Sequence, residues 1–527
     1  MTDIAHHRLA ALPAPRALLE AAKAAPSRVR FIDRQRSYML GDVVTRVAAR
    51  VEYLRDRRIG RGDHVALFAE NSIDWITSAL AIQACGAAFV GVHAGSSAAL
   101  ADYIVRHSQA KLLLASSSEL ARAGLEISGC DIVDVVTATA PLTAASYDCV
   151  ARPLDLACII YTSGTTGNPK GAMLSHANLA ANGSDWMTCC APLLGTDPVR
   201  EVLWLPFTHI FGWGDAVIGT TAGIRSRLAA PAEVAATLTD YRPHLLMTVP
   251  ALLERLARDA HSPDELHARL GGEIRLCLAG GAALSPAVKR RYREAGICVL
   301  EGYGLTETSP TLTLQRSDDP EVDGVGLPYP SVELKLADDG EVLARGPSVF
   351  AGYYRDPAAT HEVLDGDGWF HTGDLGEWLP GGQLKIVDRK KELLVLSNGK
   401  KVAPQPIEAR AAEDPWIERV VLFGTGRSGI AGLVVPNFDT IERELGRKVD
   451  RSRTSSDADV MAGLRARIDA LNAQLSTFER IRAFAIAPRT LTTADGHLTP
   501  SLKVKRRAVW ADFSQLIEPL WDRSTQS

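Results

Sequence analysis

Apolar residues in the first part of the chain follow helical and strand spacing in turn. They recur at helical spacing over residues 43–54, and the mainly apolar run 64–69 then predicts a buried strand. Two more short apolar runs, 86–92 and 110–116, come next, and Asn71 predicts the N-cap of the helix that starts after the first run. Such a β–α–β rhythm is typical of parallel sheets covered by helices on both faces. The sequence therefore predicts an α/β fold.

The pattern changes in the second part of the chain. Residues 331–388 are rich in glycine and in short alternating runs, which predict hairpins and a small antiparallel β subdomain. After Lys391, short strand patterns surround an apolar helical stripe. The stripe consists of Leu464, Ile468, Leu471 and Leu475. We therefore expect a large multi-layer N-terminal domain over 1–388, a boundary at 389–391 and a small α+β C-terminal domain over 392–527.

Length and composition restrict the class of protein. A chain of 527 residues is longer than a single hydrophobic core ordinarily stabilises, so two or more domains are expected. Its 58 lysines and arginines nearly balance 62 aspartates and glutamates, which argues against a nucleic-acid partner. The eight cysteines form no CxxC pair and no zinc pattern, as in cytoplasmic proteins with reduced thiols. Glycines, a glutamine and a histidine interrupt the apolar stretch 76–95, so no transmembrane segment is expected.

The most informative segment is a loop that follows the apolar strand 158–161. The loop is dense in hydroxyls, glycines and backbone N–H groups, and it contains one lysine, which together suit a polyphosphate. Its candidate phosphate-binding residues are Thr162, Ser163, Gly164, Thr165, Thr166, Gly167 and Lys170. Because Pro169 precedes Lys170 and Gly171 follows it, the P-loop pattern is not met. The sequence predicts phosphate binding without a P-loop fold.

The same loop resembles a family motif. Its sequence, YTSGTTGNPKG, is similar to the phosphate loop of the adenylate-forming superfamily, which includes acyl- and aryl-CoA synthetases, luciferases and peptide-synthetase adenylation domains. Further motifs of the family follow in the same order. The resemblance implies an enzyme that uses ATP and Mg²⁺ to convert a carboxylic acid into an acyl-adenylate and then into a thioester. It also implies a mobile C-terminal domain and a thiol acceptor, either coenzyme A or the phosphopantetheine of an acyl carrier protein.

A second segment, GYGLTET, resembles the nucleotide motif of that family. In the family an aromatic residue of this motif lies against adenine, a threonine contacts the α-phosphate and a glutamate binds magnesium. The matching residues are Gly302, Tyr303, Thr306 and Glu307. Magnesium is a hard cation that takes carboxylate and phosphate oxygens, so the resemblance implies that Glu307 is its ligand.

Two segments resemble the walls of the adenine and acyl pockets. The run LAGGAAL is similar to a glycine–alanine turn that floors both pockets through Gly281 and Ala282, and a tight packing turn is an equally good interpretation. Residues 205–214 resemble a Pro-x-x-His segment beside the acyl site. His209 would then lie where the two pockets meet, with an ordinary core histidine as the alternative. Trp213 matches a gating tryptophan of some long-chain synthetases, although packing is the simpler interpretation.

Three downstream features complete the resemblance. Asp374 resembles the acid that binds the ribose, since a carboxylate can accept hydrogen bonds from both ribose hydroxyls. The charged run 388–392 resembles the domain hinge, with Arg389 near the ribose and Lys391 at the pivot. Residues 396–408 resemble the loop that approaches the thiol acceptor. The candidate residues of this loop are Asn398, Gly399 and Lys400.

The run LTPSLKVKRR at 498–507 resembles the tail of long-chain acyl-CoA synthetases. The resemblance implies that Lys503 is the catalytic lysine, which bridges the incoming carboxylate and the α-phosphate. Many family members have glycine before this lysine, whereas this chain has Leu502, so Lys505 remains the alternative. The same run also fits a nuclear-localisation or polyanion-binding patch, which a net charge of -4 disfavours.

The resemblance favours a fatty acyl-CoA synthetase of medium or long chain length. An acyl-AMP ligase that loads an acyl carrier protein and an aryl-CoA ligase are the alternatives within the same enzyme class. A non-catalytic acyl or nucleotide sensor is the alternative outside it, because a fold does not guarantee activity. A cytoplasmic location is expected, with a peripheral membrane contact left open for a fatty acid substrate.

Overall fold

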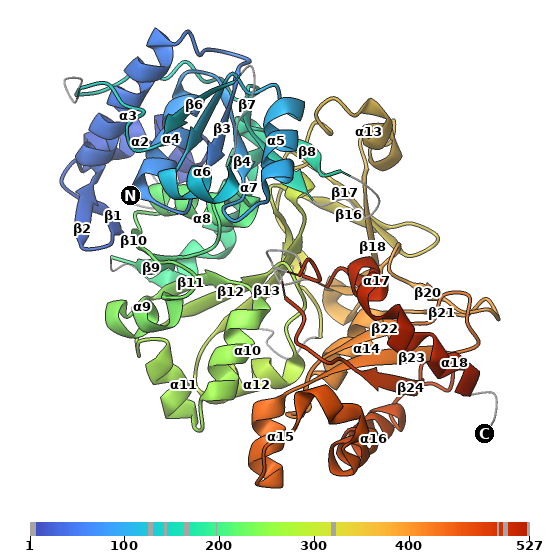
Figure 1. Ribbon diagram of the computed structural model, residues 1–527. Helices are drawn as coiled ribbons and strands as arrows, with labels where there is room; N and C mark the ends of the chain where they lie inside the picture. Colours follow the sequence, from blue (N-terminus) through green and yellow to red (C-terminus); the bar gives the residue numbers. More distant parts are fainter. Residues whose placement is uncertain are drawn as a thin grey trace.

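The computed structural model describes most of the chain. The described residues are 7–124, 130–141, 145–162, 168–195, 198–317, 323–492, 495–498 and 504–523. Figure 1 shows a large part, coloured blue to yellow, and a smaller part, coloured orange to red, that packs beside it. One described contact between the two parts is a hydrogen bond of 2.9 Å from Ser285 Oγ to Glu413 Oε1.

A six-stranded sheet dominates the first portion of the large part. In spatial order its strands are β6 (Asp131–Asp134), β5 (Leu112–Ala115), β3 (His64–Phe68), β4 (Ala88–Val92), β7 (Leu156–Thr162) and β8 (Lys170–Ser175). Neighbouring strands pair in parallel except β7 and β8, which are antiparallel. The three apolar runs of the sequence analysis are thereby confirmed as strands of one parallel sheet.

A nine-stranded sheet lies next to the first sheet. In spatial order its strands are β15 (Leu327–Pro328), β14 (Thr311–Leu314), β13 (Val299–Gly304), β12 (Leu276–Gly280), β11 (Leu245–Thr248), β9 (Arg200–Leu203), β10 (Arg225–Leu228), β1 (Val29–Asp33) and β2 (Arg36–Met39). The strands from β13 to β1 pair in parallel, and β14, β15 and β2 pair antiparallel at the two edges. The parallel strands are the expected product of β–α–β connections.

Helices flank both sheets (Figure 1). They are α2 (Ala14–Ala24), α3 (Leu40–Asp56), α4 (Ile73–Ala84), α5 (Ala98–His107), α6 (Ser117–Ala123), α7 (His176–Cys189), α8 (Ile210–Thr221), α9 (Val234–Tyr241), α10 (Pro250–Asp259), α11 (Pro263–Arg269) and α12 (Pro286–Glu294), with single turns at Ala191–Leu194 and Thr306–Thr308. Among the described residues, no helix combines the length and the apolar character that crossing a membrane requires.

The prediction of Asn71 as an N-cap was wrong by one residue. The N-cap of α4 is Ser72, whose Oγ accepts a hydrogen bond of 3.1 Å from the Trp75 amide. The Asn71 side chain instead donates from Nδ2 to the Leu205 carbonyl at 2.8 Å and accepts at Oδ1 from the Phe207 amide at 3.0 Å. Asn71 lies shortly after β3 of the six-stranded sheet, and its two hydrogen bonds join this sheet to residues 205–207. Those residues connect β9 of the nine-stranded sheet to α8.

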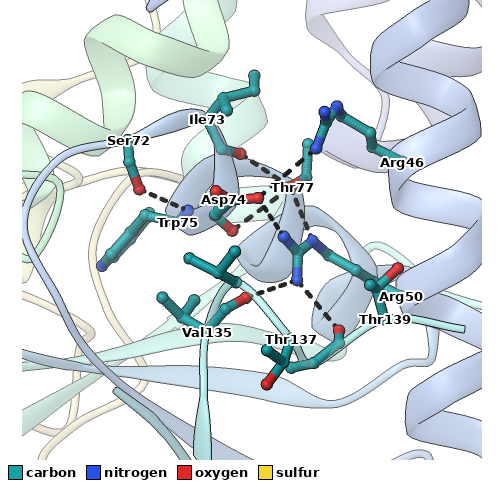
Figure 2. A network of polar contacts seen from close by, with 12 residues as sticks. Arg46, Arg50, Ser72, Ile73, Asp74, Trp75, Thr77, Val135, Thr137 and Thr139 are labelled. Carbon is teal, nitrogen blue, oxygen red and sulfur yellow. Dashed lines mark hydrogen bonds and ion pairs between the residues drawn. The ribbon is translucent and has the colours of Figure 1, made fainter. Parts of the chain in front are cut away.

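A buried arginine joins α3 to α4, as Figure 2 shows. Arg50 donates to Asp74 Oδ1 at 2.5 Å, to Thr77 Oγ1 at 2.9 Å and to the Val135 carbonyl at 2.8 Å. Arg46 adds a longer ion pair of 3.7 Å to the same aspartate. Burial of a guanidinium is tolerated here because its donors are paired.

The antiparallel β subdomain predicted for residues 331–388 is present. Its strands are β16 (Glu333–Leu336), β17 (Glu341–Arg345), β18 (Phe370–Trp378) and β19 (Leu384–Arg389), with α13 (Pro357–Val363) and a turn at Pro380–Gly382. The four strands pair in sequence order and are all antiparallel. This sheet carries two of the residues that the sequence analysis selected, one on β18 and one on β19.

The smaller part is an α+β unit, as predicted. Its elements are β20 (Leu394–Val395), β21 (Lys401–Val402), α14 (Pro404–Ala411), β22 (Ile417–Phe423), β23 (Ile430–Pro436), α15 (Phe438–Leu445), a turn at Arg451–Ser456, α16 (Ala458–Asn472), β24 (Ile481–Ile486), α17 (Arg506–Ile517) and α18 (Pro519–Arg523). The predicted stripe from Leu464 to Leu475 is buried against β22 to β24. The hydrophobic clusters of this part contain no described residue of the larger part.

Candidate active site

The glycine- and hydroxyl-rich loop connects β7 to β8. Thr162 and Lys170 pair directly across the two strands, which brings the ends of the loop together. The predicted residues between them, Ser163, Gly164, Thr165, Thr166 and Gly167, lie outside the described residues. At the next position of β8, a side chain on Gly171 would approach Ile159 Cγ2 to 2.7 Å, so only glycine fits.

The strand that follows this loop is paired with residues 352–354. Ala172 forms a β-bridge with Tyr353, the Tyr354 amide donates to the Gly171 carbonyl at 2.8 Å, and the Met173 amide donates to the Gly352 carbonyl at 3.1 Å. This pairing brings Tyr353 beside Lys170, whose Nζ lies 5.2 Å from the centre of the tyrosine ring. That distance is within the range of a cation–π contact.

Tyr353 also contacts the acid of the nucleotide motif. Its hydroxyl donates to Glu307 Oε1 at 2.8 Å, and the Phe350 amide donates to the Glu307 carbonyl at 2.8 Å. Burial raises the pKa of Glu307, whose residue exposure is 7%. Lys170, Tyr353 and Glu307 thus form one continuous cluster, which we call the Lys170 cluster.

Tyr353 was missed by the sequence analysis. It stands in the run AGYYRDP, and the tyrosine pair after a glycine was the signal available. A pair of tyrosines is an ordinary feature of a loop, and only the bridge between Ala172 and Tyr353 shows which of the two faces the glutamate. The neighbouring Tyr354 instead donates to Gln109 Oε1 at 3.0 Å.

A second cluster joins the nucleotide motif to the antiparallel sheet. The Tyr303 hydroxyl donates to Asp374 Oδ2 at 2.8 Å, and Arg389 Nε lies 3.1 Å from Asp374 Oδ1. Asp374 on β18 pairs directly with Arg389 on β19, which explains their proximity. Asp374 is only 3% exposed, so its carboxylate depends on these two donors. Three residues that the sequence analysis assigned to adenine and ribose therefore come together.

The glycine–alanine turn lies at the carboxyl end of β12. Gly280 pairs with Gly302 on β13, so Gly281 and Ala282 come next to the start of the nucleotide motif. Gly281 has a φ of 86°, a left-handed conformation that favours glycine, and no heavy atom would lie within 4 Å of a Cβ there. The backbone at Gly281 is therefore open to close approach by another molecule.

His209 and Trp213 occupy different surroundings. His209 is the N-cap residue of α8, and its ring centre lies 5.5 Å from that of His93. Trp213 is fully buried, with ring centres of Trp75 and Phe89 at 5.5 Å and 5.1 Å. Trp213 thus packs as a core aromatic residue in this conformation, and its role as a gate stays a prediction.

The hinge residue precedes the smaller part, and the acceptor-loop residues belong to it. Lys391 is exposed and lies two residues after the end of β19. Asn398, Gly399 and Lys400 form an exposed turn between β20 and β21, in which Asn398 Oδ1 accepts from the Lys400 amide at 3.0 Å. Lys400 Nζ lies 4.3 Å from the centre of the Phe478 ring, within the same part. The structure does not test the role of this turn.

The tail at 498–507 is described only at its two ends. Lys503 lies outside the described residues, so its position stays a prediction. Leu498 and Val504 form a β-bridge, and the Lys505 amide donates to the His497 carbonyl at 2.7 Å. Lys505 is exposed at the start of α17. The choice between the two lysines is left to experiment.

Comparisons with known proteins identify the family of this chain. A family model described as AMP-binding enzyme matches residues 18–354, and one described as AMP-binding enzyme C-terminal domain matches residues 391–525. The chain is 31% identical over 542 residues to the long-chain-fatty-acid–CoA ligase FadD15 of Mycobacterium bovis, in an alignment that covers 88% of each protein.

Two solved structures are similar in fold. The adenylation domain of a carboxylate reductase from Mycobacterium chelonae has a TM-score of 0.81 at 21% identity, covering 97% of this chain and 92% of that one. O-succinylbenzoate coenzyme A synthetase from Bacillus subtilis, in complex with ATP and magnesium ion, has a TM-score of 0.75 at 20% identity, covering 93% and 98%. At these identities the structures establish the fold alone. The family models and the curated relative lead further, and the chain belongs to the AMP-binding enzyme family as an AMP-forming acyl-CoA ligase.

Proposed function

We propose that this chain activates a fatty acid of medium or long chain length with ATP and Mg²⁺, and then transfers the acyl group to coenzyme A. The first step forms acyl-adenylate and pyrophosphate, and the second forms the thioester and releases AMP. The observation that carries the proposal is the Lys170 cluster, which places a cation and a buried carboxylate beside the loop of hydroxyls and glycines. The ligase activity named for the curated relative supports the choice of a fatty acid.

The chemistry of the first step is mainly electrostatic. A carboxylate must attack the α-phosphate of ATP, and both partners are anions, so positioned positive charge lowers the barrier most. Lys170 and the donors of the loop at 162–170 would hold the phosphates and the departing pyrophosphate. Asp374 and Arg389 would receive the ribose, and Tyr303, Gly281 and Ala282 would lie against the adenine. Thr306 would donate to the α-phosphate.

Glu307 fits a magnesium site by its chemistry. Its carboxylate is buried and, among the described residues, forms no ion pair with a lysine, arginine or histidine. A divalent cation would supply the missing positive charge and take phosphate oxygens as its remaining ligands. Glu307 would hold Mg²⁺, which contributes charge neutralisation on the phosphates.

The second step requires a change of partner at the adenylate. We propose that residues 1–388 and 392–527 are separate domains that rotate about Lys391. The rotation would withdraw Lys503 from the acyl-adenylate and bring Asn398, Gly399 and Lys400 to it for attack by the thiol. The independent hydrophobic clusters on either side of 389–391 support two rigid bodies with a short connection.

The test is an acceptor and substrate comparison. Purified enzyme, ATP and Mg²⁺ are combined with fatty acids of graded length or with aryl acids, and AMP release is measured with coenzyme A or with a phosphopantetheinylated carrier protein. The expected result is AMP release that depends on a fatty acid and on coenzyme A. Dependence on the carrier protein alone would identify an acyl-AMP ligase instead, and preference for aryl acids an aryl-CoA ligase. Failure of every acid to support pyrophosphate formation would refute adenylation.

A further inference from the structure

Helix α5 carries two side chains that reach the ends of the loop at 162–170, which we call the phosphate loop. Tyr103 and His107 are four residues apart, so they lie on the same face of the helix. Their rings are stacked, with centres 5.4 Å apart and an angle of 22° between the ring planes. Both residues are half-buried, and Tyr103 packs against an apolar cluster that includes Ile104 and Ile159. We call this pair of rings the α5 platform.

The α5 platform contacts both ends of the phosphate loop. The Tyr103 hydroxyl donates to the Pro169 carbonyl at 3.1 Å, and Pro169 is the residue before Lys170. His107 Nδ1 is hydrogen-bonded to the Tyr161 hydroxyl at 2.7 Å, and Tyr161 is the residue before the loop begins. One helix therefore holds the start and the end of the loop.

Tyr161 also connects the α5 platform to the strand that carries Lys170. It pairs with Gly171 across β7 and β8. A Cβ on Gly171 would lie 3.2 Å from Tyr161 Cζ, so the tyrosine ring lies over β8 next to Lys170. The side chain of Lys170 extends to the Tyr353 ring, as described above. The backbone on both sides of Lys170 is thus in contact with residues that are tied to α5.

The hydrogen bond between His107 and Tyr161 joins two uncharged groups near neutral pH. Burial lowers the pKa of His107, so its imidazole is neutral. Burial raises the pKa of Tyr161, so its phenol is neutral as well. Losing one hydrogen bond between neutral groups changes an equilibrium about three- to tenfold. An effect of this size on ATP binding can be measured.

Fixed ends favour the binding of a polyphosphate by the loop. Ordering a chain segment around a ligand costs conformational entropy. Contacts that exist before the ligand binds lower that cost. Within the described part of the chain, the α5 platform has no hydrogen bond to the residues assigned to adenine, ribose or magnesium. Its effect should therefore concern the phosphates of ATP.

We propose that Tyr103 and His107 are positioning residues of the adenylation step. They hold Lys170 and the two ends of the phosphate loop in place for the polyphosphate of ATP, and they act through Pro169 and Tyr161. The proposal rests on the proposed function, since it assigns two further residues to the same site.

The first test separates the two half-reactions. Tyr103→Phe removes the hydroxyl that contacts Pro169 and keeps the ring that stacks on His107. We expect KM for ATP in adenylate formation to rise about three- to tenfold, while KM for the fatty acid stays the same. Thioester formation from supplied acyl-adenylate and coenzyme A involves no pyrophosphate, so its rate should not change. A side chain with only a structural role would affect both half-reactions.

The second test separates hydrogen bonding from packing at His107. His107→Phe keeps a ring against Tyr103 but loses the hydrogen bond to Tyr161, and we expect it to raise KM for ATP about three- to tenfold. His107→Asn loses the ring but keeps a polar atom near the position of Nδ1. We expect this variant to raise KM for ATP less than His107→Phe does.

Tyr147→Phe is the matched control for Tyr103→Phe. The Tyr147 hydroxyl also donates to a proline carbonyl, that of Pro15 on α2, at 2.6 Å. This variant loses the same kind of hydrogen bond away from the phosphate loop, so its KM for ATP should be unchanged. Circular dichroism and thermal unfolding check that each variant folds. If Tyr103→Phe does not fold, the comparison of His107→Phe with His107→Asn decides the question.

Three results would overturn the proposal while the ligase function stands. They are an unchanged KM for ATP in Tyr103→Phe and His107→Phe, an equal loss in both half-reactions, and a similar rise of KM for ATP in Tyr147→Phe. If the unmodified enzyme forms no adenylate with any acid, the proposed function itself fails, and this proposal fails with it.

Discussion

Tyr353 links the lysine of the phosphate loop to the acid of the nucleotide motif, and the substitution Tyr353→Phe separates these two contacts. The variant keeps the ring below Lys170 and removes only the hydroxyl that donates to Glu307 Oε1 at 2.8 Å. A hydrogen bond to a charged group contributes about 1.5–3 kcal/mol. If that contribution is needed in the transition state, kcat/KM for adenylation falls by about 10- to 150-fold.

The pH dependence distinguishes positioning from simple packing. The hydrogen bond from Tyr353 lowers the pKa of Glu307, opposing the burial that raises it. Removing the hydroxyl therefore raises this pKa further, so Glu307 becomes protonated at a higher pH as the pH falls. If the enzyme needs ionised Glu307, its activity then begins to fall at a higher pH. We expect the acidic limb of kcat/KM to shift upward, and the Mg²⁺ concentration for half-maximal activity to rise.

Tyr354→Phe is the matched control for this prediction. It removes an adjacent tyrosine hydroxyl that contacts Gln109 and not Glu307. Pyrophosphate release is followed at several pH values for both variants, with thermal unfolding as a check on folding. Activity of Tyr353→Phe within twofold of the unmodified enzyme, or an equal loss in Tyr354→Phe, would refute the positioning role.

Three further predictions concern the lysine, the loop and the link between sheets. Lys503→Ala is expected to reduce adenylation by about 10²–10³-fold yet spare thioester formation from supplied acyl-adenylate, and the same result from Lys505→Ala instead would reassign the catalytic lysine. Gly171→Ala places a methyl group 2.7 Å from Ile159 Cγ2 and should lower the free energy of unfolding, measured with denaturant, by about 1–3 kcal/mol. An unchanged free energy of unfolding would contradict that close contact. Asn71→Ala leaves two backbone groups of residues 205–207 without their partner, so the free energy of unfolding should fall by about 2–4 kcal/mol. A fall of less than about 1 kcal/mol would contradict this role of Asn71.

Much of the fold could be predicted because it depends on local patterns. The apolar runs at 64–69, 86–92 and 110–116 form strands because mainly apolar segments between helices are stable inside a covered sheet. The glycine-rich region at 331–388 forms hairpins because glycine permits the turns. The cap of α4 was misassigned because Asn71 and Ser72 are both good caps, and only the distant partners of Asn71 decide between them.

In the candidate site, too, some residues could be selected from the sequence and one could not. Tyr303, Asp374 and Arg389 were selected by motif, and the structure brings the three together through the pairing of β18 with β19 and the hydrogen bond from Tyr303. Tyr353 could not be selected, because its partner Glu307 is 46 residues away and no local pattern encodes that contact.

By itself, the sequence determined the α/β class and the two-part organisation, because periodicity and residue type are local properties. Only the tertiary structure decided which hydroxyl contacts Glu307, and that Tyr303, Asp374 and Arg389 come together. The physical reason is that the energy of a polar atom depends on burial and on partners brought close by folding, and neither is fixed by its neighbours along the chain.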